Sequence, residues 1–341
     1  MRSCAEKVDC RDFRTRNQPT TIKRFALSPA NWLGLDRQIR RPARAVAALT
    51  KKGTLRAKTV SLAAAALAIF GGSGSILAQT GGIVSAVNIS ARATVSLGDK
   101  VLIGGFIVTG TSAKPILLRA LGPSLDLGNT ILAGILQDPV LELYDRNGIL
   151  IASNDDWPAS FQADLINRTL PPPDPRESAL IATLEPGSYT AIVHGYNNTT
   201  GVALVELYDL DTVNLARVAN LSTRGNVELG DAAMIGGFII NGNTDATVLV
   251  RALGPELTAR DVPGALQDTT LELRDSNGAL LAFNDDWITD REAQILFSNE
   301  APSDPRESAL VRTLAPGSYT VVVRGKNETV GIALLEVYLL E

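Results

Sequence analysis

The chain has 341 residues, of which 45% are hydrophobic and 20% are charged, and its formal net charge at pH 7 is −4. This composition excludes a disordered protein, because two or three domains of ordinary length can each bury a hydrophobic core. The charge is uneven: after residue 78 the chain holds 17 basic and 32 acidic residues, a net charge of −15, which argues against nucleic acid and anionic lipid as partners.

Residues 1–78 are a basic leader that ends in the pattern of a secretory signal peptide. Basic residues precede an apolar run at residues 60–70, and small residues follow up to Ala78. The run is shorter than the ~20 residues that span a membrane, so we predict a signal cleaved after Ala78. The mature protein is then secreted, on the cell surface or periplasmic, without a membrane span. It has no cysteine, since Cys4 and Cys10 lie in the leader.

An internal repeat covers almost all of the chain after the leader. Arg119-Ala120-Leu121-Gly122-Pro123 returns as Arg251-Ala252-Leu253-Gly254-Pro255, an offset of 132 residues. Later segments return at an offset of 130 residues, such as Asp174-Pro175-Arg176-Glu177-Ser178, which returns as Asp304-Pro305-Arg306-Glu307-Ser308. This period is too long for a solenoid unit, so we predict two domains, at residues 79–212 and 213–341.

Each repeat has the pattern of short antiparallel strands. In the first repeat, residues 141–145 alternate apolar and polar, Asn147-Gly148 supplies a turn, and residues 149–152 return, which is typical of a hairpin. Further strands are predicted at residues 101–108, 116–121, 189–193 and 202–208, and short helices only at residues 161–170 and 290–297. The predicted fold class is all-β: two tandem antiparallel β-sandwiches, similar to jelly rolls.

From the hairpin onward, each repeat resembles the secreted bacterial pre-peptidase C-terminal type of β-sandwich, a module that recurs in surface proteins. The matching segments are Leu143-Tyr144-Asp145, Asn147-Gly148, Ser153-Asn154-Asp155-Asp156, residues 184–190 and Val193-His194-Gly195, with Asp275, Asn277-Gly278, Asn284-Asp285-Asp286 and residues 314–325 in the second repeat. The resemblance covers a little over half of each repeat. It implies an accessory or surface module, and some members of such families bind calcium or an insoluble polymer.

Six aspartates are candidate calcium ligands. The segment Asn154-Asp155-Asp156-Trp157 returns as Asn284-Asp285-Asp286-Trp287, and calcium prefers carboxylate and carbonyl oxygens. Asp174 and its counterpart Asp304 are candidates to complete the two sites. The alternative is a turn in which these side chains bond nearby backbone N–H groups, while the tryptophan fills the sandwich edge. The sequence lacks the spacing of an EF-hand and leaves both readings open, so no cofactor is certain.

The repeated Asp174-Pro175-Arg176-Glu177 segment predicts a capping box around one short helical turn. Alternatively, Arg176 pairs with Asp155 or Asp156. Arg119 and Arg251 lie in apolar strands and each need an acidic partner, because an unpaired buried charge is costly. These features favour a structural role for the repeated arginines.

The sequence predicts no catalytic residue. The only histidine, His194, lies on a predicted strand, its counterpart is Arg324, and a catalytic triad needs a nucleophile, a base and an orienting group together. We therefore predict an exported, non-catalytic tandem module for adhesion, matrix or polymer binding, with an extracellular polymer or surface component as partner. A calcium-binding structural module and a carboxylate-dependent hydrolase are the alternatives.

Overall fold

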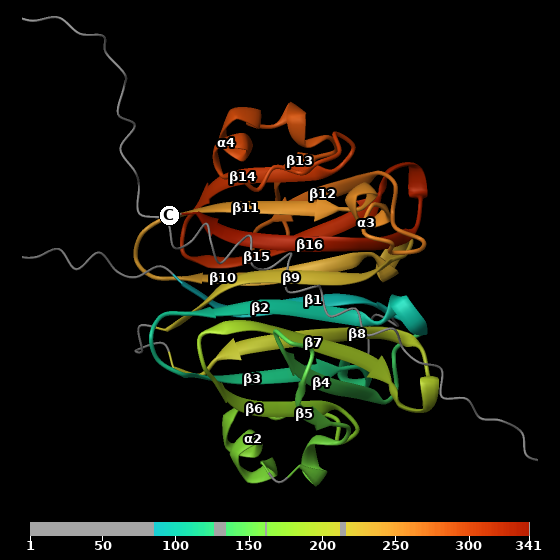
Figure 1. Ribbon diagram of the computed structural model, residues 1–341, viewed down its shortest axis with the longest axis vertical. Helices are drawn as coiled ribbons and strands as arrows, with labels where there is room; N and C mark the ends of the chain where they lie inside the picture. Colours follow the sequence, from blue (N-terminus) through green and yellow to red (C-terminus); the bar gives the residue numbers. More distant parts are fainter. Residues whose placement is uncertain (1–84, 126–133, 161, 212–215, 341) are drawn as a thin grey trace, which may run out of the picture.

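The computed structural model describes residues 85–125, 134–160, 162–211 and 216–340 (Figure 1). The predicted signal peptide and its cleavage after Ala78 lie outside these residues. Within the described ranges, no helix has the length and apolar character needed to cross a membrane.

The strands are antiparallel and dominate both repeats, which confirms the all-β prediction. In the first repeat they are β1 (Ser85–Val95), β2 (Leu102–Thr109), β3 (Lys114–Leu121), β4 (Pro139–Asp145), β5 (Leu150–Asn154), β6 (Ser178–Leu184), β7 (Gly187–Gly195) and β8 (Gly201–Asp209). In the second they are β9 (Arg217–Val227), β10 (Met234–Asn241), β11 (Ala246–Leu253), β12 (Thr269–Arg274), β13 (Leu280–Asn284), β14 (Ser308–Leu314), β15 (Gly317–Gly325) and β16 (Gly331–Leu340).

Local sequence explains these strands. The predicted hairpin is β4–β5, where the Asp145 carboxylate accepts hydrogen bonds from the N–H groups of Asn147 and Ile149, both at 2.8 Å. Gly148 takes a φ of 74° there, which a glycine adopts without steric cost. In contrast, the sequence analysis did not indicate β1 or β6.

The strand order of each repeat is that of a jelly roll. In the first repeat the strands pair as β1-β8-β3-β6 and as β2-β7-β4-β5. In the second they pair in the same way, as β9-β16-β11-β14 and as β10-β15-β12-β13. Two four-stranded sheets of this kind face each other and bury the side chains between them.

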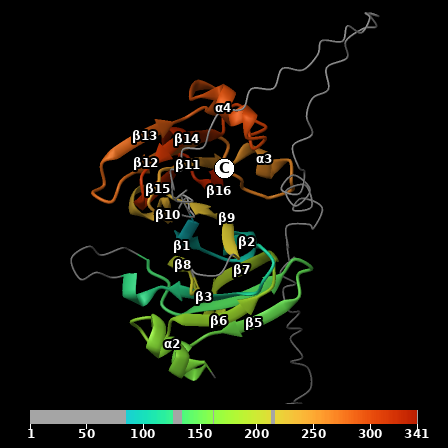
Figure 2. The same ribbon diagram turned by 90° about the vertical axis from the view of Figure 1, so that its left-hand side faces the viewer.

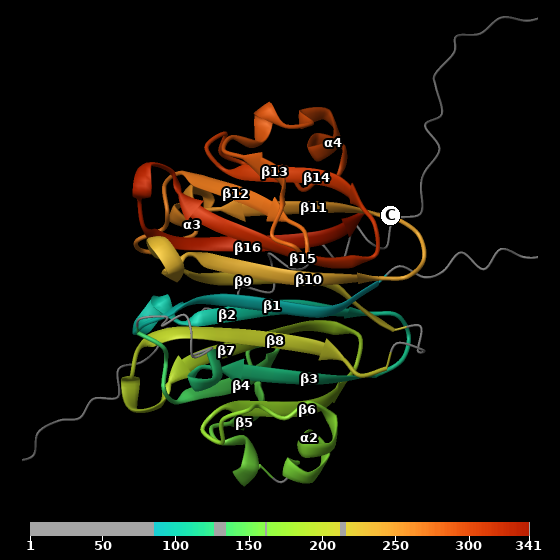
Figure 3. The same cartoon turned by 180° about the vertical axis from the view of Figure 1, so that it is seen from behind.

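The repeats are joined by reciprocal pairing of their sheet edges (Figures 1 and 3). Strand β1 pairs with β10, with Ile89 opposite Phe238, and β2 pairs with β9, with Phe106 opposite Leu221. One eight-stranded path therefore runs β6-β3-β8-β1-β10-β15-β12-β13 and the other runs β14-β11-β16-β9-β2-β7-β4-β5, and the two are joined by one pair of residues, Thr94 of β1 with Asn226 of β9. The reciprocal pairing removes four sheet edges that would otherwise be exposed.

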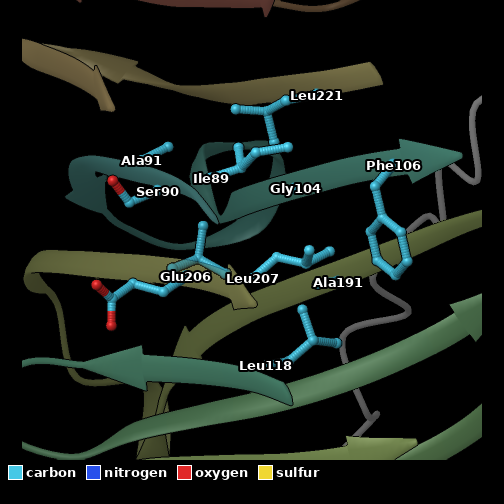
Figure 4. A pocket seen from close by; sticks show the side chains of 11 residues that line it. Ile89, Ser90, Ala91, Gly104, Phe106, Leu118, Ala191, Glu206, Leu207 and Leu221 are labelled. Atoms are coloured by element: carbon cyan, nitrogen blue, oxygen red, sulfur yellow. The ribbon is translucent and has the colours of Figure 1, made fainter. Parts of the chain in front are cut away.

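The apolar core lies between the facing sheets, and the two repeats fill it differently. A small cavity in the first repeat lies among Ile89, Phe106 and Leu118 (Figure 4). At its wall, a Cβ added to Gly104 would lie 3.7 Å from Val205 Cγ1, an ordinary contact. In the second repeat, a Cβ added to Gly236 would collide with the side chain of Leu335, the counterpart of Val205.

The helices are short. They are α2 (Ala163–Thr169), α3 (Pro255–Thr258) and α4 (Glu292–Phe297), with 3-10 turns η1 (Gly98–Lys100), η2 (Pro123–Leu125), η3 (Trp157–Ala159), η4 (Tyr196–Asn198), η5 (Gly230–Ala232), η6 (Trp287–Thr289) and η7 (Lys326–Glu328). Helices α2 and α4 lie at opposite ends of the molecule (Figure 2). Trp157 packs with Leu117, Ile166 and Ala179 against the outer face of the β3–β6 pair, rather than at the edge of the sandwich.

Candidate functional site

An acidic loop cluster lies at one end of the β7-β4-β5 sheet. Asp138 directly precedes β4, and Asp155 and Asp156 directly follow β5. Because β4 lies between β5 and β7, these loops and η4 meet at the same end of the sheet. In the second repeat, β12, β13 and β15 bring the same loops together.

The repeated Asn-Asp-Asp segment is held to β6 by Asn154 and Ser178. Asn154 Oδ1 accepts a hydrogen bond from Ala179 N at 2.8 Å, and its Nδ2 donates to Asp156 O at 3.1 Å. Ser178 Oγ donates to a carbonyl of the same segment at 2.7 Å. Asn284 makes the two equivalent bonds in the second repeat. The turn is therefore fixed by the asparagine, and none of these bonds uses an aspartate carboxylate.

Glu177 is the buried carboxylate that ties the two repeated motifs together. Its side chain is fully buried and accepts hydrogen bonds from the N–H groups of Gly122 and Ser124, both at 2.9 Å. It also accepts the N–H of Asp174 at 3.2 Å, which is the return bond of a capping box. Glu307 bonds in the same manner. The sequence analysis assigned Glu177 to the cap and missed its bonds to the Leu-Gly-Pro loop.

Asp174 and Asp304 are each hydrogen-bonded to a neighbouring arginine. Arg176 Nε donates to Asp174 Oδ1 at 3.0 Å, and its Nη2 donates to Oδ2 at 2.9 Å. These bonds hold the pKa of Asp174 below its usual value. Arg306 binds Asp304 in the same way. The arginine thus pairs within its own turn and not with Asp155 or Asp156, the partners weighed from the sequence.

In the second repeat the acidic cluster contains a lysine. One carboxylate oxygen from each of Asp268, Asp285 and Asp286 lies within 4.8 Å of the others. Lys326 Nζ lies 2.7 Å from Asp285 Oδ2, 3.8 Å from Asp268 Oδ2 and 4.0 Å from Asp286 Oδ2. The hydrogen bond to Asp285 raises the pKa of Lys326. The positive charge of Lys326 therefore offsets the negative charge of this cluster.

In the first repeat the lysine is replaced by Tyr196, which is 46% exposed. Burial, followed by the charges of Asp138 and Asp156, raises the pKa of Asp155. Burial and the charge of Asp156 likewise raise the pKa of Asp138. His194 offers little compensation, since its Nε2 is 4.0 Å from Glu142 and the ring is charged only when protonated. The first cluster is thus the less compensated of the two.

Both clusters contain carboxylate oxygens that are buried without a hydrogen-bond partner. In the first repeat these are Oδ1 of Asp138 and of Asp155, and in the second they are Oδ1 of Asp268 and of Asp285. An unpaired buried oxygen is costly and is commonly explained by a bound ion or water. The sequence analysis missed Asp138 and Asp268, although Gln137-Asp138 returns as Gln267-Asp268 at the offset of 130.

The buried arginines have the acidic partners that the sequence analysis expected. Arg119 Nε donates to Glu206 Oε2 at 2.9 Å, and its guanidinium lies 5.1 Å from the ring centre of Tyr208. Arg251 Nε donates to Glu336 Oε2 at 2.6 Å, with a second carboxylate, Glu300, at 3.2 Å. These groups neutralise one another on the sheet faces, and they account for the arginines structurally.

No family model matches the chain, and no curated protein matches it. Among solved structures, a DUF4785 family protein from Legionella pneumophila subsp. pneumophila str. Philadelphia 1 is 10% identical, with a TM-score of 0.23, over 76% of this chain and 80% of that one. PNGF-II is 12% identical, with a TM-score of 0.19, over 74% of this chain and 56% of that one. At these TM-scores, neither structure indicates a function for this chain.

Proposed function

We propose that the chain is an exported, non-catalytic protein of two tandem jelly-roll domains, which binds a polymer or surface component outside the cytoplasm. The acidic charge after residue 78 and the signal-like pattern before it support export and a neutral or cationic ligand. The resemblance of each repeat to secreted surface modules supports the same role.

The observation that carries the proposal is that the repeated polar side chains make structural hydrogen bonds. Arg119, Asn154, Asp174, Glu177 and Ser178 are all repeated, and each is engaged in hydrogen bonds within its own repeat. Residues duplicated for catalysis would present a nucleophile and a base to a common space. These residues instead fix loops to strands, which is what a rigid binding scaffold requires.

Fractionation of the native culture tests export and surface binding together. The protein should be found in the extracellular or cell-surface fraction, with an N-terminus close to Gln79, and high salt or excess soluble polymer should release it from that fraction. Recovery from the cytoplasm with the leader intact would contradict the proposal.

A second candidate function, a calcium-stabilised structural module, is favoured by the unpaired carboxylate oxygens. Calcium takes carboxylate and carbonyl oxygens, and among the described residues only Asp268, Asp285 and Asp286 bring one carboxylate oxygen each within 4.8 Å of the others, so these three are the candidate ligands. In the second repeat, the ammonium of Lys326 competes for the same carboxylates. A calcium ion would supply structural stability there, and no chemical step.

Thermal unfolding with calcium and with chelator tests this candidate. Binding to the folded state alone stabilises it by about 2.7 kcal/mol at about a hundredfold excess over Kd. The melting temperature should rise with calcium in the wild type, and Asp285→Asn should reduce the rise more than Asp155→Asn. An unchanged melting temperature in the wild type would eliminate calcium, yet it would leave the polymer-binding proposal standing.

A further inference from the structure

Each end of the molecule carries two outer sheet edges, and one of them is blocked by side chains. At the first end, the edge of β6 is covered by Gln162, which accepts the N–H of Ile181 at 2.9 Å and donates to its carbonyl at 2.7 Å. Asn154 takes the N–H of Ala179 on the same edge. At the other end, Asn284 takes the N–H of Ala309 on β14. Backbone groups satisfied in this way are less available to another strand.

The other outer edges, β5 and β13, are open. In the described part of the chain, β5 pairs only with β4 and β13 pairs only with β12. Both strands expose apolar side chains where an edge strand is usually charged: Leu150 is 46% exposed, Ile151 44%, Leu280 54%, Leu281 44% and Phe283 53%. A β-bulge lies at Ile151 and at Leu281, and both residues of each bulge are exposed.

We propose that β5 and β13 are self-association edges, through which copies of this chain join end to end. The chain already makes this kind of contact internally, because β1 pairs with β10 and β2 with β9 across the two repeats. A contact at β5 or β13 continues the same two paths into a second molecule. The partner is a second copy because the matching apolar edge is present on the chain itself.

The position of the edges determines the form of the assembly. Strand β5 ends one path in the first repeat, and β13 ends the other path in the second repeat, at opposite ends of the molecule (Figure 1). A molecule with two such edges adds a neighbour at each end, so association does not close and produces linear chains. This inference does not depend on the polymer-binding role.

Analytical ultracentrifugation of the chain expressed with its own leader tests the inference, with charged substitutions as edge blockers. For the wild type, the average mass should rise with concentration beyond that of a dimer. The contacts join like edges, β5 with β5 and β13 with β13, so Ile151→Lys blocks one kind of contact and leaves the other, and this variant should stop at dimers, as should Leu281→Lys. The double variant should stay monomeric at all concentrations.

Leu97 and Leu229 supply the matched control, since they are exposed leucines at equivalent turns away from both edges, at 56% and 53%. The double variant Leu97→Lys/Leu229→Lys should assemble as the wild type does. Circular dichroism should show that every variant is folded, and Leu150→Lys replaces Ile151→Lys if that variant does not fold. A wild type that is monomeric at every concentration, or edge variants that assemble like the wild type, would overturn the inference.

Discussion

The Nζ atom of Lys326 lies 2.7 Å from Oδ2 of Asp285, whereas the corresponding residue in the first repeat is Tyr196. The acidic clusters of the two repeats therefore differ in how far a positive charge offsets their negative charge. The difference extends to the neighbouring strands, where the second repeat has cations and the first has aromatic rings: Arg274 and Arg324 stand in place of Tyr144 and His194. Each repeat therefore serves as a reference against which the effect of these charges in the other repeat is measured.

Tyr196→Lys should stabilise the protein by copying the second repeat into the first. The new ammonium group would face Asp138, Asp155 and Asp156, whose mutual repulsion is less compensated than that of the second cluster. Because the site is partly exposed, we expect a gain of about 0.5 kcal/mol, or a rise of about 1–2 °C in melting temperature. Thermal unfolding in chelator measures it, with Tyr196→Gln as the uncharged control. An equal gain in the control would show that charge is not the cause.

Asp155→Asn should stabilise the protein at neutral pH and have little effect in acid. The raised pKa of Asp155 means that its contribution to stability is fully present below the unfolded pKa of about 3.9 and is lost as pH rises through the folded pKa. A neutral amide avoids that loss, so we expect a gain of about 0.5 kcal/mol at pH 7 that vanishes near about pH 3. Urea unfolding at both pH values measures the difference. A gain that is independent of pH would contradict this origin.

The buried pair of Lys114 and Asp209 should be replaceable by two apolar residues. Their charged atoms are 2.8 Å apart, and the side chains are 1% and 4% exposed. The second repeat has Ala246 and Leu339 at these places. Removing one partner leaves a buried charge, so Lys114→Ala alone should cost about 3–5 kcal/mol. The double variant Lys114→Ala/Asp209→Leu should be neutral or stabilising, and a double variant as unstable as the single one would contradict this account.

Gly104 and Gly236 should respond oppositely to substitution by alanine. The added Cβ at Gly104 meets Val205 at an ordinary distance, so Gly104→Ala should stabilise by about 0.5 kcal/mol through the unfolded chain. At Gly236 the same Cβ collides with Leu335, so Gly236→Ala should cost about 1–3 kcal/mol. Chemical unfolding of the two variants provides the comparison. Equal effects would mean that the two repeats are packed alike.

Local signals account for the part of the fold that the sequence predicted. The Asn147-Gly148 turn and the alternating residues before it specify the β4–β5 hairpin without reference to the rest of the chain. The reciprocal pairing of β1 with β10 was not predictable in this way. Ile89, Ala91 and Ala93 alternate toward the core, and the same alternation would suit pairing within one repeat.

For a similar reason, the sequence predicted only part of the candidate site. Asp155 and Asp156 stand out because they are adjacent and repeated. Asp138 joins them only because β4 lies beside β5, a relationship in space that the sequence does not state. The bonding of Asp174 did have a local signal, since Arg176 follows two residues later and binds both carboxylate oxygens.

The proposed non-catalytic binding role is tested most directly by a mass balance on insoluble polymer. The protein purified from the culture is incubated with peptidoglycan sacculi, cellulose or chitin, and the pellet and the supernatant are both measured over time. We predict saturable transfer of the protein to the pellet with one of these polymers, and no increase of soluble sugar or peptide in the supernatant. Soluble products that accumulate in proportion to time and enzyme concentration would contradict the account, because they would identify the chain as a hydrolase.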